Sequence, residues 1–192
     1  ARWPRRCAVC CESPVLRLGS EPSSKSSTKG TATDTKYWVG FNIVPGIGPA
    51  RLKRLIDYFG DAEKAWRSAP MDLARSGLDR KSLQALLAAR DKLDLDAEMS
   101  RIKSFGARVV TLADESYPRL LREIGLPPPV LYFKGTLTPA DDYAVAVVGT
   151  RHVKTYGREV TRYLSGELAR NKITVVSGLA LGIDAVAHQA AM

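Results

Sequence analysis

Two stretches of sequence decide the fold of this chain: VVGTR at residues 147–151 and VVSGLALGID at residues 175–184. Each begins as an apolar run and stops at a small residue, after which the first offers a guanidinium group and the second a glycine-rich turn. We predict that both runs are buried strands joined by one helix. Parallel strands bring the turns at their carboxyl ends to one edge of the sheet, where α/β folds bind anionic ligands.

The surroundings of these stretches predict a strand–helix–strand unit. The expected strands, 143–148 and 173–176, are continuously apolar, as is typical of strands covered on both faces. Between them, helical spacing predicts an amphipathic helix. Its apolar residues are Tyr156, Val160, Tyr163, Leu164 and Leu168. We expect a right-handed crossover and a further helix from about Gly182. Because the chain stops at Met192, we expect the sheet to be incomplete.

Residues 37–106 predict a small helical domain. Pro49 fits the first turn of a helix that Gly60 ends, and Asp61 and Asp79 are expected to cap two further helices. A last helical stretch precedes Gly106. No internal repeat of solenoid length is present.

The pattern changes over residues 107–192. Strands are predicted at 108–112 and 130–133, with the stiff prolines Pro127 to Pro129 directly before the second one. Together with the strand–helix–strand unit, these elements indicate the first part of an α/β domain.

The composition favours a negatively charged partner. The 192 residues carry a formal net charge of +9, which favours nucleic acid, anionic lipid or phosphorylated ligands. Part of this excess lies in residues 1–36, which we expect to be a disordered basic tail because they offer almost nothing to bury. No apolar stretch approaches the roughly 18 residues that span a bilayer, and no leader pattern is present. We therefore expect a cytoplasmic protein without a membrane partner.

The cysteines Cys7, Cys10 and Cys11 predict neither a disulfide framework nor a metal site. The spacing of Cys7 and Cys10 suits a zinc knuckle, but a four-ligand site needs a second pair, and His152 and His188 lie far along the chain. No cofactor is expected, because G-x-G-x-x-G and the acidic residue that would hold a ribose are absent.

The turn after the first apolar run has the features of a phosphate site. Gly149 ends the strand, Thr150 can donate a hydroxyl, and Arg151 can grip a phosphate with its planar fork. Lys154 adds charge near a helix start, where amide groups are free. The alternative interpretation is an ordinary strand-to-helix turn with a surface arginine.

The second turn carries two glycines four residues apart. Gly178 and Gly182 would let the chain run close to a ligand or to the neighbouring loop. Asp184 at a helix start would interact favourably with the helix dipole, or it could orient Arg151 or accept a hydrogen bond from a base. His188 follows one turn later, but no nucleophile accompanies it, so a packing pair is favoured over a catalytic dyad.

A third glycine turn, VPGIG at residues 44–48, precedes a helix and is similar to a helix–hairpin–helix turn. Gly46 and Gly48 would let bare amide groups approach a phosphate, with Arg51 beside them. Leu52 stands where that motif usually has a small residue. The alternative is a turn whose glycines only allow the bend, and the sequence leaves both interpretations open.

Over residues 37–192 these motifs together resemble the DNA-processing protein A (DprA/Smf) family. The similarity lies in the order and spacing of VGTR, YG, SGLA, GID and AH between residues 148 and 188. It implies a sterile-alpha-motif-like helical domain followed by an extended Rossmann-like domain. It also implies a phosphate clamp with two walls. The first wall is Gly149, Thr150 and Arg151, and the second is Ser177, Gly178, Gly182 and Asp184.

The resemblance implies a function as well. Family members bind single-stranded DNA, load RecA recombinase onto it during natural transformation, act as homodimers and are not enzymes. We therefore expect a recombination mediator without catalytic residues, whose RecA and dimer contacts lie beyond Met192. Leu181 stands where many members carry a basic residue, which makes the expected pocket less positive. The rival class is a nucleotide phosphoribohydrolase acting on nucleoside monophosphates, but such enzymes do not need the helical domain.

Overall fold

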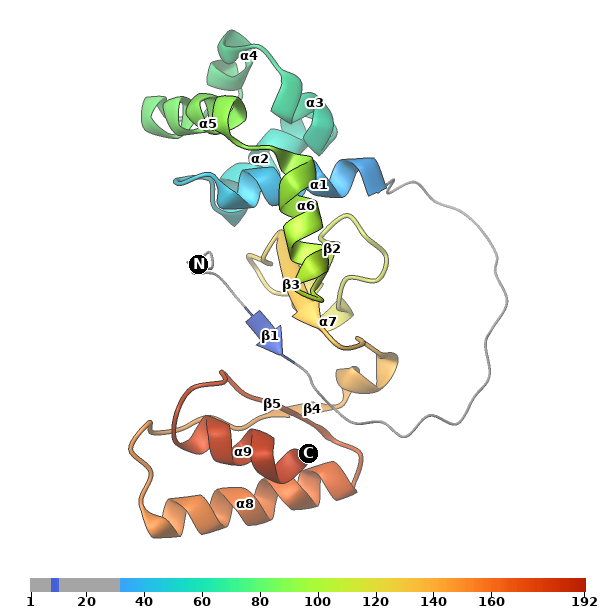
Figure 1. Ribbon diagram of the computed structural model, residues 1–192, viewed down its shortest axis with the longest axis vertical. Coiled ribbons are helices and arrows are strands. Elements are labelled where there is room, and N and C mark those ends of the chain that lie inside the picture. Colours follow the sequence, from blue (N-terminus) through green and yellow to red (C-terminus); the bar gives the residue numbers. More distant parts are fainter. Residues whose placement is uncertain (1–7, 11–31) are drawn as a thin grey trace, which may run out of the picture. The chain divides into compact units, whose positions relative to one another are not determined.

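The computed structural model describes residues 8–10 and 32–192, which form two compact units (Figure 1). Among the described residues, the first unit holds Ala8 and residues 32–133, and the second holds residues 9–10 and 134–192. The expectations for Cys7, Cys11 and residues 11–31 lie outside the described residues. The domain limits expected near residues 36 and 106 remain predictions.

Helices make up most of the first unit, as the sequence predicts. They are α1 (Ala32–Ile43), α2 (Pro49–Phe59), α3 (Ala62–Arg67), α4 (Pro70–Arg75), α5 (Arg80–Lys92) and α6 (Leu95–Ser104). Helix α1 begins within the segment expected to be a tail. Its Lys36 ammonium group lies 2.9 Å from the Asp96 carboxylate of α6, so the end of that segment is held to the folded unit.

The predicted ends of these helices are confirmed. Pro49 is the first residue of α2, and Gly60 ends it with a φ of +89°, a conformation that favours glycine. Asp61 accepts a hydrogen bond from the Lys64 amide at 2.7 Å, and Asp79 caps α5 in the same way.

The core of the first unit lies between its helices and extends to its sheet. Phe41 is fully buried, and its ring meets that of Trp66 edge-on, with centroids 5.1 Å apart. The buried strand residues Val130 and Tyr132 join the same core. Its largest fully buried apolar side chains are Phe41, Leu52, Leu55, Leu73 and Leu86.

The strands before residue 135 form a three-stranded sheet in the order β1-β3-β2. Its strands are β1 (Ala8–Cys10), β2 (Arg108–Thr111) and β3 (Val130–Lys134), with the short helix α7 (Arg119–Arg122) between the last two. Strands β2 and β3 pair antiparallel, with Arg108 opposite Phe133. The two strands predicted after residue 106 are thus confirmed and belong to one sheet.

The second unit is the predicted strand–helix–strand arrangement with one more helix. Its elements are the 3-10 turn η1 (Pro139–Asp142), β4 (Ala144–Ala146), α8 (Thr155–Arg170), β5 (Thr174–Val176) and α9 (Ile183–Ala191). Strands β4 and β5 pair in parallel, with Val145 opposite Val175. The chain is therefore of the α/β class. Among the described residues, no helix combines the length and apolar character that crossing a membrane requires.

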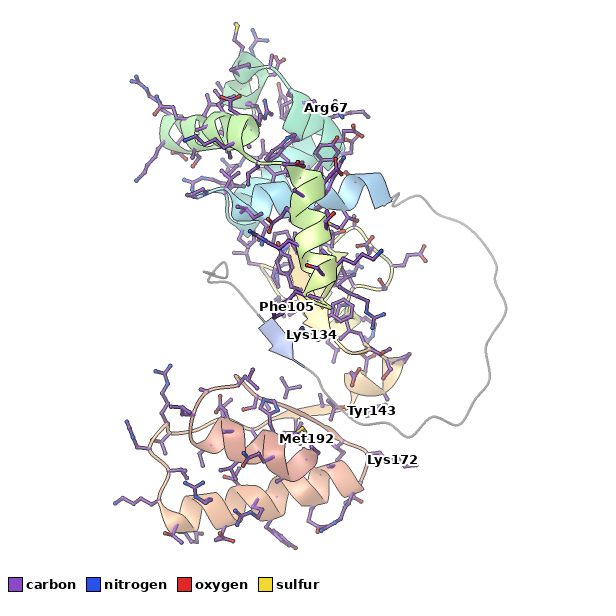
Figure 2. The ribbon with its side chains drawn as sticks, in the orientation of Figure 1. Arg67, Phe105, Lys134, Tyr143, Lys172 and Met192 are labelled. Carbon is purple, nitrogen blue, oxygen red and sulfur yellow. The ribbon has the colours of Figure 1, made fainter. Side chains whose placement is uncertain are left out.

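The expectation that β4 and β5 are covered on both faces is wrong for the described residues. All of β4 is exposed, Val176 of β5 is exposed, and Tyr143, just before β4, is 77% exposed (Figure 2). The contacts of the second unit explain this, because α8 and α9 pack on each other and on β5, and no described layer covers the rest of the two strands.

The apolar face predicted for α8 is wrong in part, because only Val160 and Leu168 of its five residues are half-buried. Tyr156, Tyr163 and Leu164 are exposed, whereas Thr161 and Ser165 are buried. Small residues on that side of α8 let α9 approach closely. A Cβ added at Gly166, for example, would lie 3.6 Å from the Ala190 carbonyl of α9. Close helix packing therefore buried the small residues and left the aromatic ones outside.

The cap of α5 predicts a pH dependence of stability. The Ser82 hydroxyl donates to Asp79 at 2.8 Å, and this bond, with one from the Ser82 amide and the charge of Arg51, holds the pKa of Asp79 below its ordinary value. Such a carboxylate stabilises the fold above its unfolded pKa near 4, and this contribution is lost as the pH falls through the lower folded pKa.

We therefore expect Asp79→Asn to lower the melting temperature near pH 7 and to lower it by less near pH 3, where the unfolded state has taken up its proton and the Asp79 charge contributes less to stability. Ser82→Ala, which removes the hydroxyl donor, should reduce the same pH-dependent difference in melting temperature. Circular dichroism melts at the two pH values measure this. An equal loss at both would contradict the role given to the Asp79 charge.

Candidate functional site: the two glycine loops

The loop after β4 and the loop after β5 lie side by side and are bonded to each other. The Ile183 amide donates to the Thr150 carbonyl at 3.1 Å, and the Ser177 hydroxyl donates to the Val147 carbonyl at 2.6 Å. The Val147 amide also donates to the Val176 carbonyl at 2.9 Å, which extends the ladder beyond β4. The prediction that both turns meet at one edge is confirmed.

Glycine is required where the loops meet. A Cβ added at Gly182 would lie 2.2 Å from the Thr150 carbonyl oxygen, and the φ of +86° there also favours glycine. A Cβ at Gly149 would lie 2.6 Å from the Ile183 side chain. The glycines of both motifs therefore serve the contact between the two loops.

Asp184 braces the second loop from inside. Its side chain is only 6% exposed, and its Oδ2 accepts hydrogen bonds from the amides of Gly178 at 3.1 Å and Ala180 at 3.4 Å. Of the roles that the sequence leaves open for Asp184, these hydrogen bonds therefore support a structural role within its own loop. Asp184 acts as a positioning residue that fixes the path of the backbone.

His188 does not form a proton relay with Asp184. The Nε2 atom of His188 is buried without a hydrogen-bond partner among the described residues, and the Asp184 carboxylate faces loop amides instead. The geometry therefore lacks the ordered pair that general acid–base catalysis needs.

Basic side chains gather where this edge meets α8. Arg151, Lys154 and Arg158 are exposed, and within residues 8–10 and 32–192 their side chains form no hydrogen bond or ion pair. We call these three residues the cationic edge. Helices α8 and α9 begin at the same end of the unit (Figure 1), and a Cβ at Gly157 of α8 would lie 3.8 Å from Ile183 of α9. Two helix N-termini, whose amides favour anions, thus lie beside unpaired cations.

Sequence reasoning missed Leu179 as a feature of this site. Its φ of +53° is in the left-handed region, which a leucine rarely adopts, and the hydrogen bonds of Gly178 and Ala180 to Asp184 hold it there. Its side chain is exposed. No sequence signal identifies this conformation, since left-handed positions are expected at glycine or asparagine.

The third glycine turn lies in the first unit and has a structural explanation. Gly46 has a φ of +89°, and Gly48 is the N-cap residue of α2. Arg51 donates to the Gly46 carbonyl at 2.6 Å and pairs with Asp79 at 2.8 Å, so its guanidinium group is engaged within the fold. These contacts favour the bend-only interpretation, and DNA contact by this turn remains a prediction.

Metal ligands do not converge in the part of the chain that the structure describes. Among those residues no group of three or more His, Cys, Asp or Glu side chains could hold an ion. The loop site itself presents amides, hydroxyls and cations, which together suit an anionic ligand.

Comparisons with known proteins agree with the motifs. The sequence model of a family described as DNA recombination-mediator protein A matches residues 108–192. The chain is 36% identical over 165 residues to protein Smf of Synechocystis sp., covering 83% of this chain and 42% of that protein. It is 30% identical over 138 residues to DNA processing protein DprA of Bacillus subtilis, covering 67% of this chain and 46% of that protein.

A solved structure shares the fold. The X-ray structure of DNA processing protein A from Streptococcus pneumoniae matches with a TM-score of 0.63 and 27% sequence identity, over 82% of this chain and 53% of that one. The chain thus spans less than half the length of the two curated relatives, and about half of the solved chain.

The contact at Gly182 yields a test of the loop architecture. We expect Gly182→Ala to lower the free energy of unfolding by at least about 2 kcal/mol, because the methyl group meets backbone carbonyls and the positive φ is unfavourable for alanine. Urea unfolding measures the change.

Gly166→Ala is the matched control in the same unit. Its Cβ finds ordinary contact with the Ala190 carbonyl, and alanine is the better helix former by about 0.5 to 1 kcal/mol, so this variant should be neutral or more stable. Equal stability of the two variants would show that the loops do not depend on the close approach at Gly182.

Proposed function

Because this chain belongs to the DprA/Smf family, we propose that it takes part in DNA processing by binding the phosphate backbone of single-stranded DNA. The binding site is the loop pair formed by residues 149–151 and 177–184, together with the cationic edge. Gly149, Thr150 and Arg151 form one wall with Lys154, and Ser177, Gly178, Gly182 and Asp184 form the other.

One observation carries this proposal: the bonded glycine loops present Arg151 and Lys154, without partners among the described residues, next to the N-terminal ends of α8 and α9. A phosphodiester group needs such donors. The guanidinium fork can bond two of its oxygens, and helix amides add directed donors with partial positive charge. Asp184 lowers the ordering cost of binding, because it holds the loop in place before the ligand arrives.

The domain arrangement is part of the proposal. In it, residues 37–106 form a sterile-alpha-motif-like helical domain and residues 107–192 form the first part of a Rossmann-like domain. The helix–hairpin–helix turn at Gly46 and Gly48 adds at most a weak DNA contact, since Arg51 is engaged by Asp79.

The wider role we propose is recombination mediation without catalysis. The description of the matching family as a DNA recombination-mediator protein and the names of the relatives support it. In this role the complete protein acts in the cytoplasm as a homodimer during natural transformation and passes single-stranded DNA to RecA recombinase. The site uses no cofactor, and its buried carboxylate and histidine hold structure rather than transfer protons.

Replacing the central arginine tests the proposal. We expect Arg151→Ala to weaken binding of a fluorescent oligo-dT roughly tenfold at low salt, because one charge-assisted phosphate contact is lost. Binding would be measured by anisotropy across a salt series. The slope of log affinity against log salt should become shallower by about 0.7, which corresponds to one phosphate contact with a single strand.

Arg75→Ala is the control for charge alone, since Arg75 is an exposed arginine of α4 in the other unit. It should leave the slope unchanged. If Arg151→Ala and Arg75→Ala bind the oligonucleotide equally across salt, Arg151 is not a phosphate contact and the proposed site is wrong.

A further inference from the structure

The outer face of α8 carries two tyrosines that nothing in the described fold explains. Tyr156 is 82% exposed and Tyr163 is 67% exposed. They are seven residues apart, so they lie two turns apart on one face, about 10 Å from each other along the helix axis. Neither side chain has a hydrogen bond or a ring contact with another described residue.

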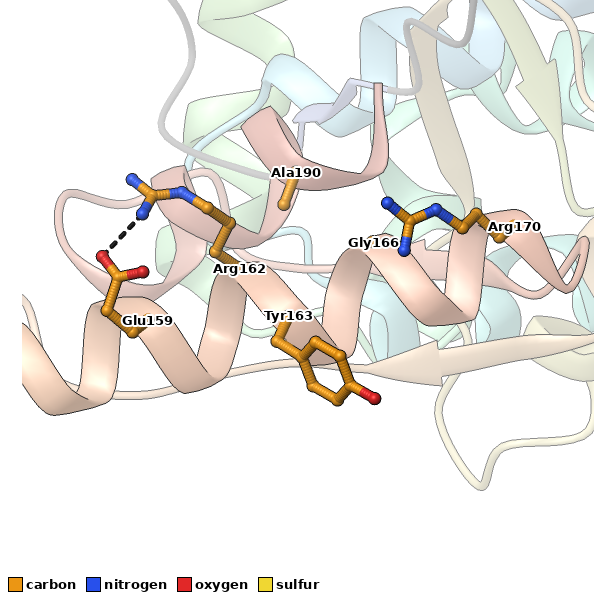
Figure 3. A pocket seen from close by; sticks show the side chains of 6 residues that line it. All are labelled: Glu159, Arg162, Tyr163, Gly166, Arg170 and Ala190. Carbon is orange, nitrogen blue, oxygen red and sulfur yellow. Dashed lines mark hydrogen bonds and ion pairs between the residues drawn. The ribbon is translucent and has the colours of Figure 1, made fainter.

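Guanidinium groups accompany the second tyrosine. A groove of about 300 Å³ runs along α8 beside α9 and is lined by Glu159, Arg162, Tyr163, Gly166, Arg170 and Ala190 (Figure 3). The Arg162 guanidinium lies 2.6 Å from the Glu159 carboxylate, and Arg170 pairs with Glu167 in the same way. Gly166 and Ala190 line the groove with little side-chain bulk.

These groups together are those that recognise nucleotides. An aromatic face accepts a stacked base whatever its sequence, and a neighbouring arginine can bond the phosphate or stack in turn. The ion pairs of Arg162 and Arg170 are exposed and join residues three apart, so each is worth less than about 1 kcal/mol and can give way to a phosphate.

The position of this face continues the loop site. Tyr156 lies in the first turn of α8, two residues after Lys154 of the cationic edge. From Tyr156 to Arg170 the helix rises about 21 Å, which is the length of about six stacked nucleotides. A strand held by its phosphates at the cationic edge can therefore follow α8 without leaving the second unit.

We propose that this outer face of α8, with Tyr156 and Tyr163 as its rings and Arg162 and Arg170 as its cations, is a stacking platform for the bases of a single DNA strand. The inference rests on the proposed function and deepens it, because it explains selection of single strands over duplexes. Duplex bases are stacked within the helix and present no free face to an exposed ring, whereas phosphates alone are common to both forms.

Removing the rings while keeping their apolar bulk tests the platform. The double variant Tyr156→Leu/Tyr163→Leu should bind oligo-dT at least fivefold more weakly, since each base stacked on an aromatic ring is worth about 1–3 kcal/mol. Its salt slope should equal that of the unaltered chain, because no phosphate contact is lost. Weak binding to a duplex of the same length should not change.

Two controls keep the test specific. Tyr156→Phe/Tyr163→Phe retains both rings and should bind like the unaltered chain. Tyr143→Leu removes an equally exposed tyrosine of the same unit that lies off α8, and it should have no effect. All of these side chains are exposed, so urea unfolding should be the same for every variant.

The outcomes separate the two levels of the argument. If the leucine variant binds like the unaltered chain while Arg151→Ala still flattens the salt slope, the function stands and the platform is wrong. Equal weakening for single strand and duplex also overturns the platform, as does a changed oligomeric state with unchanged DNA binding, which would indicate a protein interface. If the unaltered chain binds no oligo-dT, both proposals fall.

Discussion

The close approach of two backbones at Gly182 determines the architecture of the second unit. The Thr150 carbonyl lies where any side chain at position 182 would begin, and the Ile183 amide next to that position donates to the same carbonyl. A backbone hydrogen bond, rather than side-chain packing, therefore links the two strand ends. The linkage sets where α9 begins, and with it the position of the Asp184 carboxylate that fixes the loop preceding it.

Rigidity of the loop follows from that carboxylate. A buried anion is unfavourable unless hydrogen bonds satisfy it, and here the amides of Gly178 and Ala180 do so at the first turn of a helix. The same bonds hold Leu179 in a left-handed conformation that costs about 1–3 kcal/mol. A loop under such constraint has little conformational freedom left to lose, which suits a site that must meet an extended and flexible ligand.

Sequence reasoning succeeded where one residue fixes the local structure. The caps at Asp61 and Asp79, the end of α2 at Gly60 and the meeting of the glycine loops all follow from backbone requirements that few residue types meet. It failed on burial. The exposed side of α8 carries Tyr163, and the buried side carries Ser165. Helix α9 packs on the side of α8 where small residues allow the two helices to come close, not on the side with the larger apolar residues. Apolar periodicity cannot detect such a choice, and the conformation of Leu179 has no sequence signal at all.

The structure also locates the positive charge that the sequence only counts. The net charge of +9 suggests an anionic partner without locating it. On several helices of the described chain, basic side chains face an acidic neighbour one turn away, as Arg67 does Glu63 and Arg101 does Glu98. Such pairs cancel much of their own field. Within the described part of the chain, Arg151 and Lys154 form no ion pair, and they lie where two helix dipoles point outward. The location of uncompensated charge, rather than its total, is therefore what makes this edge attractive to a phosphate backbone.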